Sequence, residues 1–199
     1  MPNVLLKTYT QLPGFDRREI LRYAGYRGEA DEATAALLDE CLAESANAFD
    51  CRVAYLELPL ESFCAAFEDA NVLRATRLQN AERVVVFAAT VGLGIDRLTA
   101  RYASVSTAKA LLFQAIGAER VEAVCDCFCE ELLGAYREKG YTLLPRFSPG
   151  YGAFPLTAQR DMFRLLDCSR KIGVSLQESL LMTPTKSVTA VVAIQKEEK

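Results

Sequence analysis

The segment from Arg83 to Thr90 constrains the fold most strongly, because nearly all of its residues are apolar. An unbroken apolar run of this length is typical of a strand that is covered on both faces. The segment from Cys51 to Leu60 alternates apolar and polar residues, which predicts a half-buried strand. A sheet with such strands needs helices against it, so the chain is expected to combine both kinds of element.

Helical patterns surround these strands. A long helical region is expected from Ser106 or Thr107 to about Lys139, with a kink or break at Gly117. Further helices are expected over residues 16–23, 31–47, 71–79 and 157–168, and after Gly94. Residues 62–67 are expected to form a strand, and residues 175–182 and 187–194 a hairpin around the turn at 183–186. No repeat or linker divides the chain, so residues 1–199 are expected to form one domain.

The charge and hydropathy patterns exclude several function classes. The net charge is −3 and the pI about 5.2, and no cluster of basic and aromatic residues is present, so nucleic acid is not an expected partner. The N-terminal residues do not resemble a secretory signal. The most apolar run, from Val84 to Ile95, is shorter than the roughly 20 residues that span a bilayer. The protein is therefore expected to be cytoplasmic and not bound to a membrane.

Histidine is absent and cysteine is abundant. Without histidine, the chain cannot supply a Ser-His or Cys-His catalytic pair or an imidazole metal ligand. The seven cysteines are odd in number and scattered, which favours reduced thiols over a disulfide framework. Cys125 and Cys129 share a helix face but no CxxC pair exists, so no metal site is predicted.

The loop from Arg146 to Gly152 has the composition of a ligand-binding segment. Prolines restrict its backbone, and Gly150 lets a ligand approach closely. The Arg146 guanidinium can grip a carboxylate through two hydrogen bonds, and Tyr151 can stack on a base or face a sulfonium. The backbone near Ser148 can bind polar ligand edges. The alternative is an ordinary solvated arginine in a surface loop.

An acidic column lies in the second half of the long helical region. Glu122, Asp126 and Glu130 follow one another at four-residue spacing beside an apolar stripe. Like charges at this spacing repel, so a compensating cation is expected from Arg120, Arg137 or a ligand. Glu122 can accept hydrogen bonds from ligand amino or hydroxyl groups. From the residues alone, however, a solvated helix face is the preferred interpretation of the column.

Glycines also mark the segment from Thr90 to Gly94, between a strand and a helix. This placement suits a phosphate loop. The position where a dinucleotide fingerprint has its third glycine is Arg97, and no Walker lysine follows. A structural turn is therefore the preferred interpretation.

Four ordered blocks carry a family resemblance. They are residues 88–98, residues 117–122, the loop 146–152, and residues 171–188 with Met182-Thr183-Pro184 and Lys186-Ser187-Val188. With these blocks the chain resembles the S-adenosylmethionine-binding reactivation domain of cobalamin-dependent methionine synthase, particularly its free-standing bacterial form. The resemblance implies an α+β fold: one C-shaped domain with a twisted, mainly antiparallel sheet, flanked by helices that include the long helical region.

The resemblance also implies a ligand site. Glu122, Arg146 and Tyr151 match family ligand positions for S-adenosylmethionine. According to the resemblance, Arg146 and Glu122 hold polar groups of the ligand. The backbone from Ser148 to Gly150 contacts the nucleoside, and Tyr151 forms one wall of the groove. An early acidic ligand and a later aromatic ligand of the fused enzymes have no match here. Weak binding, or completion of the groove by another subunit, is therefore expected.

The implied function is that of an accessory subunit of a split methionine synthase. Such a subunit presents S-adenosylmethionine to inactive cob(II)alamin on a partner, the cobalamin-binding methionine synthase subunit, while a flavodoxin-like or ferredoxin-like donor supplies an electron. Two alternatives remain open. One is a docking or sensing module for a corrinoid protein without an S-adenosylmethionine site of its own. The other is a reactivator of a different corrinoid methyltransferase.

Overall fold

The computed structural model describes residues 3–28, 30–67 and 70–197, and its centre is a five-stranded antiparallel sheet. The strand order is β1-β2-β3-β7-β4, and every neighbouring pair is antiparallel. The bounds of the sheet strands are β1 Leu5–Tyr9, β2 Cys51–Pro59, β3 Arg83–Thr90, β4 Tyr141–Leu143 and β7 Ser187–Lys196. A separate two-stranded ribbon pairs β5 (Ser175–Leu176) with β6 (Met182–Thr183).

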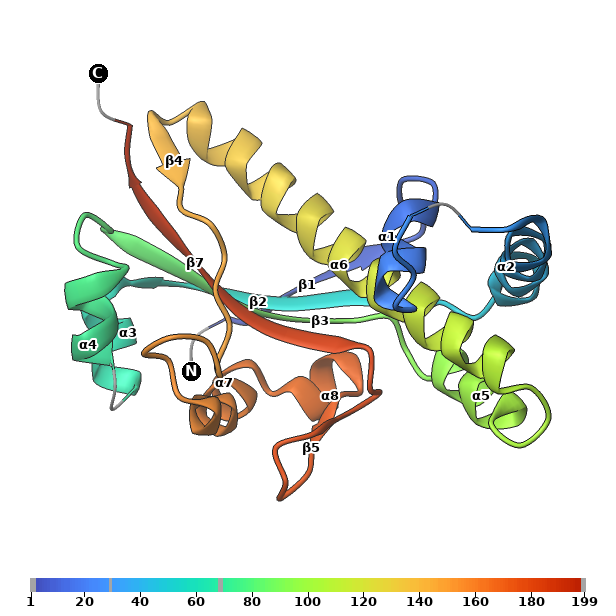
Figure 1. The fold of residues 1–199 in the computed structure, drawn as a ribbon. Helices are drawn as coiled ribbons and strands as arrows, with labels where there is room; N and C mark the ends of the chain where they lie inside the picture. Colours follow the sequence, from blue (N-terminus) through green and yellow to red (C-terminus); the bar gives the residue numbers. More distant parts are fainter. Residues whose placement is uncertain (1–2, 29, 68–69, 198–199) are drawn as a thin grey trace.

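Helices cover both faces of the twisted sheet (Figure 1). On one face, α6 crosses the sheet diagonally, and α1, α2 and α5 pack around it. On the other face lie α3, α4, α7 and α8. The bounds are α1 Arg17–Tyr23, α2 Glu32–Ser45, α3 Leu60–Ala66, α4 Ala70–Thr76, α5 Gly94–Tyr102, α6 Thr107–Arg137, α7 Gln159–Leu166 and α8 Cys168–Ile172, with a 3-10 turn at Leu156–Ala158.

Two apolar cores lie on the two faces of the sheet, because β3 is buried on both sides as its sequence predicts. Phe87 points to the α6 face, where the Phe128 ring lies 5.0 Å from it and 5.0 Å from the Tyr55 ring. Val86 points to the opposite core with Phe63 and Met162. The pairing of β3 with β2 and β7 therefore fixes α6 on one face and α7 on the other.

Several predicted elements are confirmed with near-identical bounds. Strands β2 and β3 match the predicted segments. Asp16, Asp31 and Ser106 are the N-caps of α1, α2 and α6, and each side chain accepts a backbone N–H of the first turn. Helices α4, α5 and α7 also lie where they were expected.

Three local predictions are wrong. Residues 62–66 belong to helix α3, and Phe67 is its C-cap. The Phe63 and Phe67 rings pack against each other in a tilted arrangement, with centroids 4.6 Å apart, in the core below the sheet rather than along a strand. Helix α6 runs unbroken through Gly117, because the missing side chain makes room for Ile95 and Lys186. The expected hairpin does not form, since β7 pairs with β3 and β4 rather than with the preceding segment.

None of the helices in the described parts of the chain combines the length and apolar character needed to cross a lipid bilayer.

Candidate functional site

The acidic column lies along the rim of α6. Val121, Val124 and Phe128 are buried against the sheet, whereas Glu122 is half-buried and Asp126 and Glu130 are exposed. The carboxylates therefore lie at the boundary between the core and solvent. They are within reach of the segment that follows β4 in the sequence.

Arg146 comes from the segment after β4, which runs alongside β7 toward α7 (Figure 1). Two contacts with β7 fix its backbone: Leu144 N donates to Ala193 O at 2.9 Å, and Phe147 N donates to Val191 O at 3.0 Å. Because successive side chains of an extended segment point to opposite faces, Phe147 enters the core on the α7 face and Arg146 points to α6.

Arg146 joins two members of the acidic column. Its Nη2 donates to Glu122 Oε2, and its Nη1 donates to Asp126 Oδ1 at 2.7 Å. The Arg146 side chain is 24% exposed. The cation that compensates Glu122 and Asp126 is therefore Arg146, and not Arg120 or Arg137, which the sequence had suggested. The structure brings Glu122 and Arg146 together across 24 residues of chain.

The other three predicted site residues follow in a tight loop. The Gly150 N–H donates to Phe154 O at 2.7 Å, and the Tyr151 N–H donates to Ser148 O at 3.3 Å. Gly150 has a φ of 92°, in the left-handed region that favours glycine. Tyr151 is 71% exposed. The roles of Ser148, Gly150 and Tyr151 in ligand binding stay predictions.

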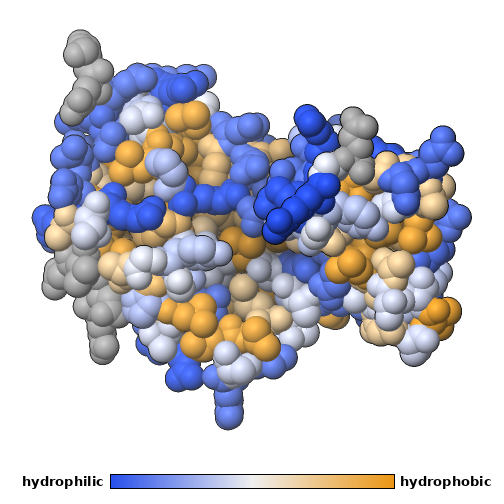
Figure 2. Space-filling model, viewed as in Figure 1, coloured by the Kyte–Doolittle hydropathy of each residue, from blue (hydrophilic) through white to orange (hydrophobic). Residues whose placement is uncertain are grey.

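Two grooves flank the acidic column and share Asp126 and Glu130. The α1–α6 groove, of about 450 Å³, is lined by six carboxylates together with Tyr23 and Cys127; these carboxylates are Asp16, Glu19, Glu119, Glu122, Asp126 and Glu130. Figure 2 shows hydrophilic side chains gathered where α1 lies against α6. The β4–α6 groove, of about 560 Å³, combines Arg146 with apolar residues, among them Leu133, Leu144 and Val192.

A buried ion pair, which the sequence did not reveal, holds the segment before α1 against α6 at the α1–α6 groove. Glu119 and Arg120 are 6% and 4% exposed and pair at 2.7 Å. Glu119 Oε1 also accepts the Asp16 N–H at 3.0 Å, and Arg120 Nη1 donates to Pro13 O at 2.8 Å. In the sequence both residues lie in the block 117–122, and Arg120 was expected to be a cation for the acidic column rather than the buried partner of Glu119.

The thiols beside Arg146 are protonated at neutral pH. Burial raises the pKa of Cys129 to about 11, and the Arg146 charge opposes this rise. Burial also raises the pKa of Cys125. All seven cysteines are free. Among the described residues, no group of three or more His, Cys, Asp or Glu is arranged to hold a metal.

The glycine-marked segment at the start of α5 packs closely against backbone. A Cβ on Gly94 would lie 2.1 Å from Ala48 O. This contact supports the interpretation of the segment as a structural turn.

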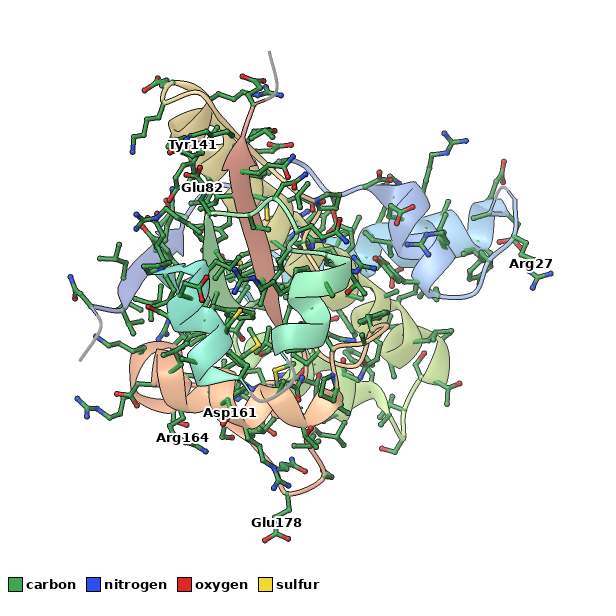
Figure 3. All side chains as sticks on the ribbon, turned by 90° about the vertical axis from the view of Figure 1, so that its left-hand side faces the viewer. Arg27, Glu82, Tyr141, Asp161, Arg164 and Glu178 are labelled. Carbon is green, nitrogen blue, oxygen red and sulfur yellow. The ribbon has the colours of Figure 1, made fainter. Side chains whose placement is uncertain are left out.

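A still larger cavity, of about 710 Å³, lies on the other face of the sheet. Asp161 and Arg164, labelled on α7 in Figure 3, line it together with residues of α8. None of the five predicted site residues lines this cavity.

Comparison with known proteins identifies the family to which the chain belongs. Residues 65–199 match the family model described as Vitamin B12 dependent methionine synthase, activation domain. The chain belongs to this family of vitamin B12-dependent methionine synthase activation domains. No curated protein sequence matches the chain.

The fold matches that of a solved structure, described as the crystal structure of the MetH reactivation domain bound to AdoHcy. The TM-score is 0.67 and the sequence identity 16%, and the match covers 100% of this chain and 80% of that chain. At this identity the match shows the fold, and it confirms the predicted C-shaped α+β domain with a twisted antiparallel sheet.

Proposed function

We propose that this protein binds S-adenosylmethionine at Glu122, Arg146 and the loop that contains Ser148, Gly150 and Tyr151. We further propose that it acts as an accessory subunit of a split cobalamin-dependent methionine synthase. In this role it supports reductive remethylation of inactive cob(II)alamin on a partner protein. The observation that carries the proposal is the contact between Arg146 and Glu122, two residues that the family resemblance assigns to the ligand site.

The charges around Arg146 suit the chemistry of this ligand. S-adenosylmethionine carries a carboxylate, an ammonium and a sulfonium. The Arg146 guanidinium offers paired donors to the carboxylate. The Glu122 carboxylate, which contacts the same arginine, attracts the two cationic groups.

The surrounding surfaces suit the rest of the ligand. The apolar wall of the β4–α6 groove accepts the uncharged parts of the molecule. Tyr151, exposed and preceded by a glycine with positive φ, can close over the nucleoside.

The protein's contribution to the reaction is binding and orientation. Bound S-adenosylmethionine would supply the methyl group and leave as S-adenosylhomocysteine. The partner's cob(II)alamin would accept the methyl group after gaining one electron from a flavodoxin-like or ferredoxin-like donor. Holding the methyl donor on a rigid surface that docks on the partner makes the transfer a local step. The chain needs no acid–base pair for this task.

A reconstitution experiment tests the proposal. The cobalamin-binding subunit of a methionine synthase that lacks this domain is prepared with cob(II)alamin and mixed with a one-electron reductant and S-adenosylmethionine. Addition of this protein is expected to restore the methylcobalamin absorption spectrum, and addition of the Arg146→Ala variant is expected to restore it much more slowly. Equal recovery without the protein would refute the proposal.

The docking alternative is separated by a pull-down with the same partner. Association that is unchanged by Arg146→Ala and by S-adenosylmethionine, together with no recovery of methylcobalamin, would favour a docking or sensing module. If methylcobalamin recovers only with a different corrinoid methyltransferase, the protein is a reactivator of that enzyme.

A further inference from the structure

Both terminal nitrogens of Arg146 are engaged by carboxylates of the protein itself. Nη1 is held by Asp126 and Nη2 by Glu122. A ligand carboxylate that approaches these nitrogens therefore either replaces one of the two protein carboxylates or binds beside them, through the remaining N–H groups of the guanidinium. The structure thus raises the question of which one yields.

The exposure of the two carboxylates answers this question. The side chain of Asp126 is 64% exposed, whereas that of Glu122 is 41% exposed. After a carboxylate leaves an ion pair, water hydrates it more completely where the side chain is more exposed. Displacing Asp126 therefore costs less free energy than displacing Glu122. The Arg146 backbone is held on both sides by β7, so the exchange requires a side-chain movement of Asp126 alone.

We infer that Asp126 is an internal substitute for the ligand carboxylate. It occupies Nη1 of Arg146 in the free protein and yields to a ligand that brings a carboxylate of its own. Asp126 thereby determines how well the site distinguishes adenosyl ligands with a carboxylate from those without one. This inference rests on the proposed S-adenosylmethionine site.

The effect of removing Asp126 on affinity depends on whether the ligand has a carboxylate. Removing Asp126 frees Nη1 and strengthens binding only where a ligand carboxylate takes its place. An exposed ion pair of this kind corresponds to a gain of about two- to fivefold in affinity. A ligand that lacks the carboxylate gains nothing from the freed donor.

Glu130 provides a matched control. It belongs to the same acidic column, one turn further along α6, and is exposed like Asp126. It forms no ion pair among the residues that the structure describes. Asp126→Ala and Glu130→Ala therefore remove the same charge from the same helix face, but only the first releases Arg146.

The test is calorimetric titration of the wild-type protein and both variants with two ligands. S-adenosylhomocysteine carries the carboxylate, and 5′-methylthioadenosine keeps the nucleoside and sulfur but lacks the amino acid. Asp126→Ala is expected to bind S-adenosylhomocysteine about two to five times more tightly and 5′-methylthioadenosine with unchanged affinity. Glu130→Ala is expected to change the ratio of the two affinities by less than a factor of about 1.5. Thermal unfolding verifies that both variants are folded.

Three results would overturn the inference while leaving the proposed site in place. One is unchanged affinity of Asp126→Ala for S-adenosylhomocysteine, and another is weaker affinity, which would make Asp126 a direct ligand contact. The third is an equal gain in Glu130→Ala, which would reduce the effect to general electrostatics. Absence of binding in the wild-type protein and in Asp126→Ala would instead overturn the proposed site.

Discussion

The buried ion pair between Glu119 and Arg120 gives the strongest stability prediction. The pair is almost completely shielded from water, and it ties the segment before α1 to α6 through Pro13 and Asp16. Arg120→Met keeps most of the side-chain volume but leaves the Glu119 carboxylate buried without its cation. Breaking a buried pair in this way costs about 3–5 kcal/mol.

The assay is urea unfolding followed by far-ultraviolet circular dichroism. The free energy of unfolding of Arg120→Met is expected to fall by about 3–5 kcal/mol. Arg101→Met is the control, because the Arg101 side chain is 68% exposed and lies 3.5 Å from Glu44. An exposed pair of this kind contributes about 0–1 kcal/mol. Adding Glu119→Gln to Arg120→Met is expected to recover part of the loss, since the stranded charge is removed.

The reasoning would be refuted if Arg120→Met were no less stable than Arg101→Met. It would also fail if the double variant were less stable than Arg120→Met alone. Hydrogen exchange of the Asp16 amide reports the local effect, because this N–H donates to Glu119 in the wild-type protein. Its exchange is expected to accelerate in Arg120→Met by more than that of amides in β3.

The remaining predictions concern two glycines of α6 and one thiol. Gly134→Ala is expected to stabilise the protein by up to about 1 kcal/mol, because a Cβ there meets no atom within 4 Å. Gly117→Ala is expected to destabilise it by about 1–2 kcal/mol, because the Cβ would lie 2.9 Å from Lys186 Cγ; equal melting temperatures of the two variants would contradict this. The Cys129 pKa rises from 9.0 to about 11 on folding, so its stabilising effect is complete below pH 9 and is lost toward pH 11. Between pH 9 and pH 11, the free energy of unfolding measured with urea is expected to fall less for Cys129→Ala than for the wild-type protein. An equal fall would refute the raised pKa of Cys129.

Local signals predicted the elements that lie closest to the site. The buried run of β3 and the N-cap of α6 at Ser106 are complete within a few residues, so periodicity and capping rules apply to them directly. The acidic column on α6 followed from helical spacing alone. The strand β1 gave no comparable signal, because it is short and lies at the edge of the sheet.

Contacts between distant segments were harder to predict. The proximity of Arg146 to Glu122 depends on the pairing of β4 with β7 and on the packing of α6 across the sheet, neither of which is encoded in a short pattern. The family resemblance placed both residues at the ligand site, but it did not reveal that they pair with each other. Nor did it reveal that Asp126 shares the same guanidinium.

The most direct test of the central claim is calorimetric titration of S-adenosylmethionine into the wild-type protein, Arg146→Ala and Arg137→Ala. Arg137 lies on the exposed end of α6 and serves as the charge-matched control. The account predicts saturable binding by the wild-type protein and Arg137→Ala, and a loss of about tenfold or more in Arg146→Ala, since hydrogen bonds to charged groups contribute about 1.5–3 kcal/mol. Equal binding by all three proteins would contradict the assignment of the site to Arg146.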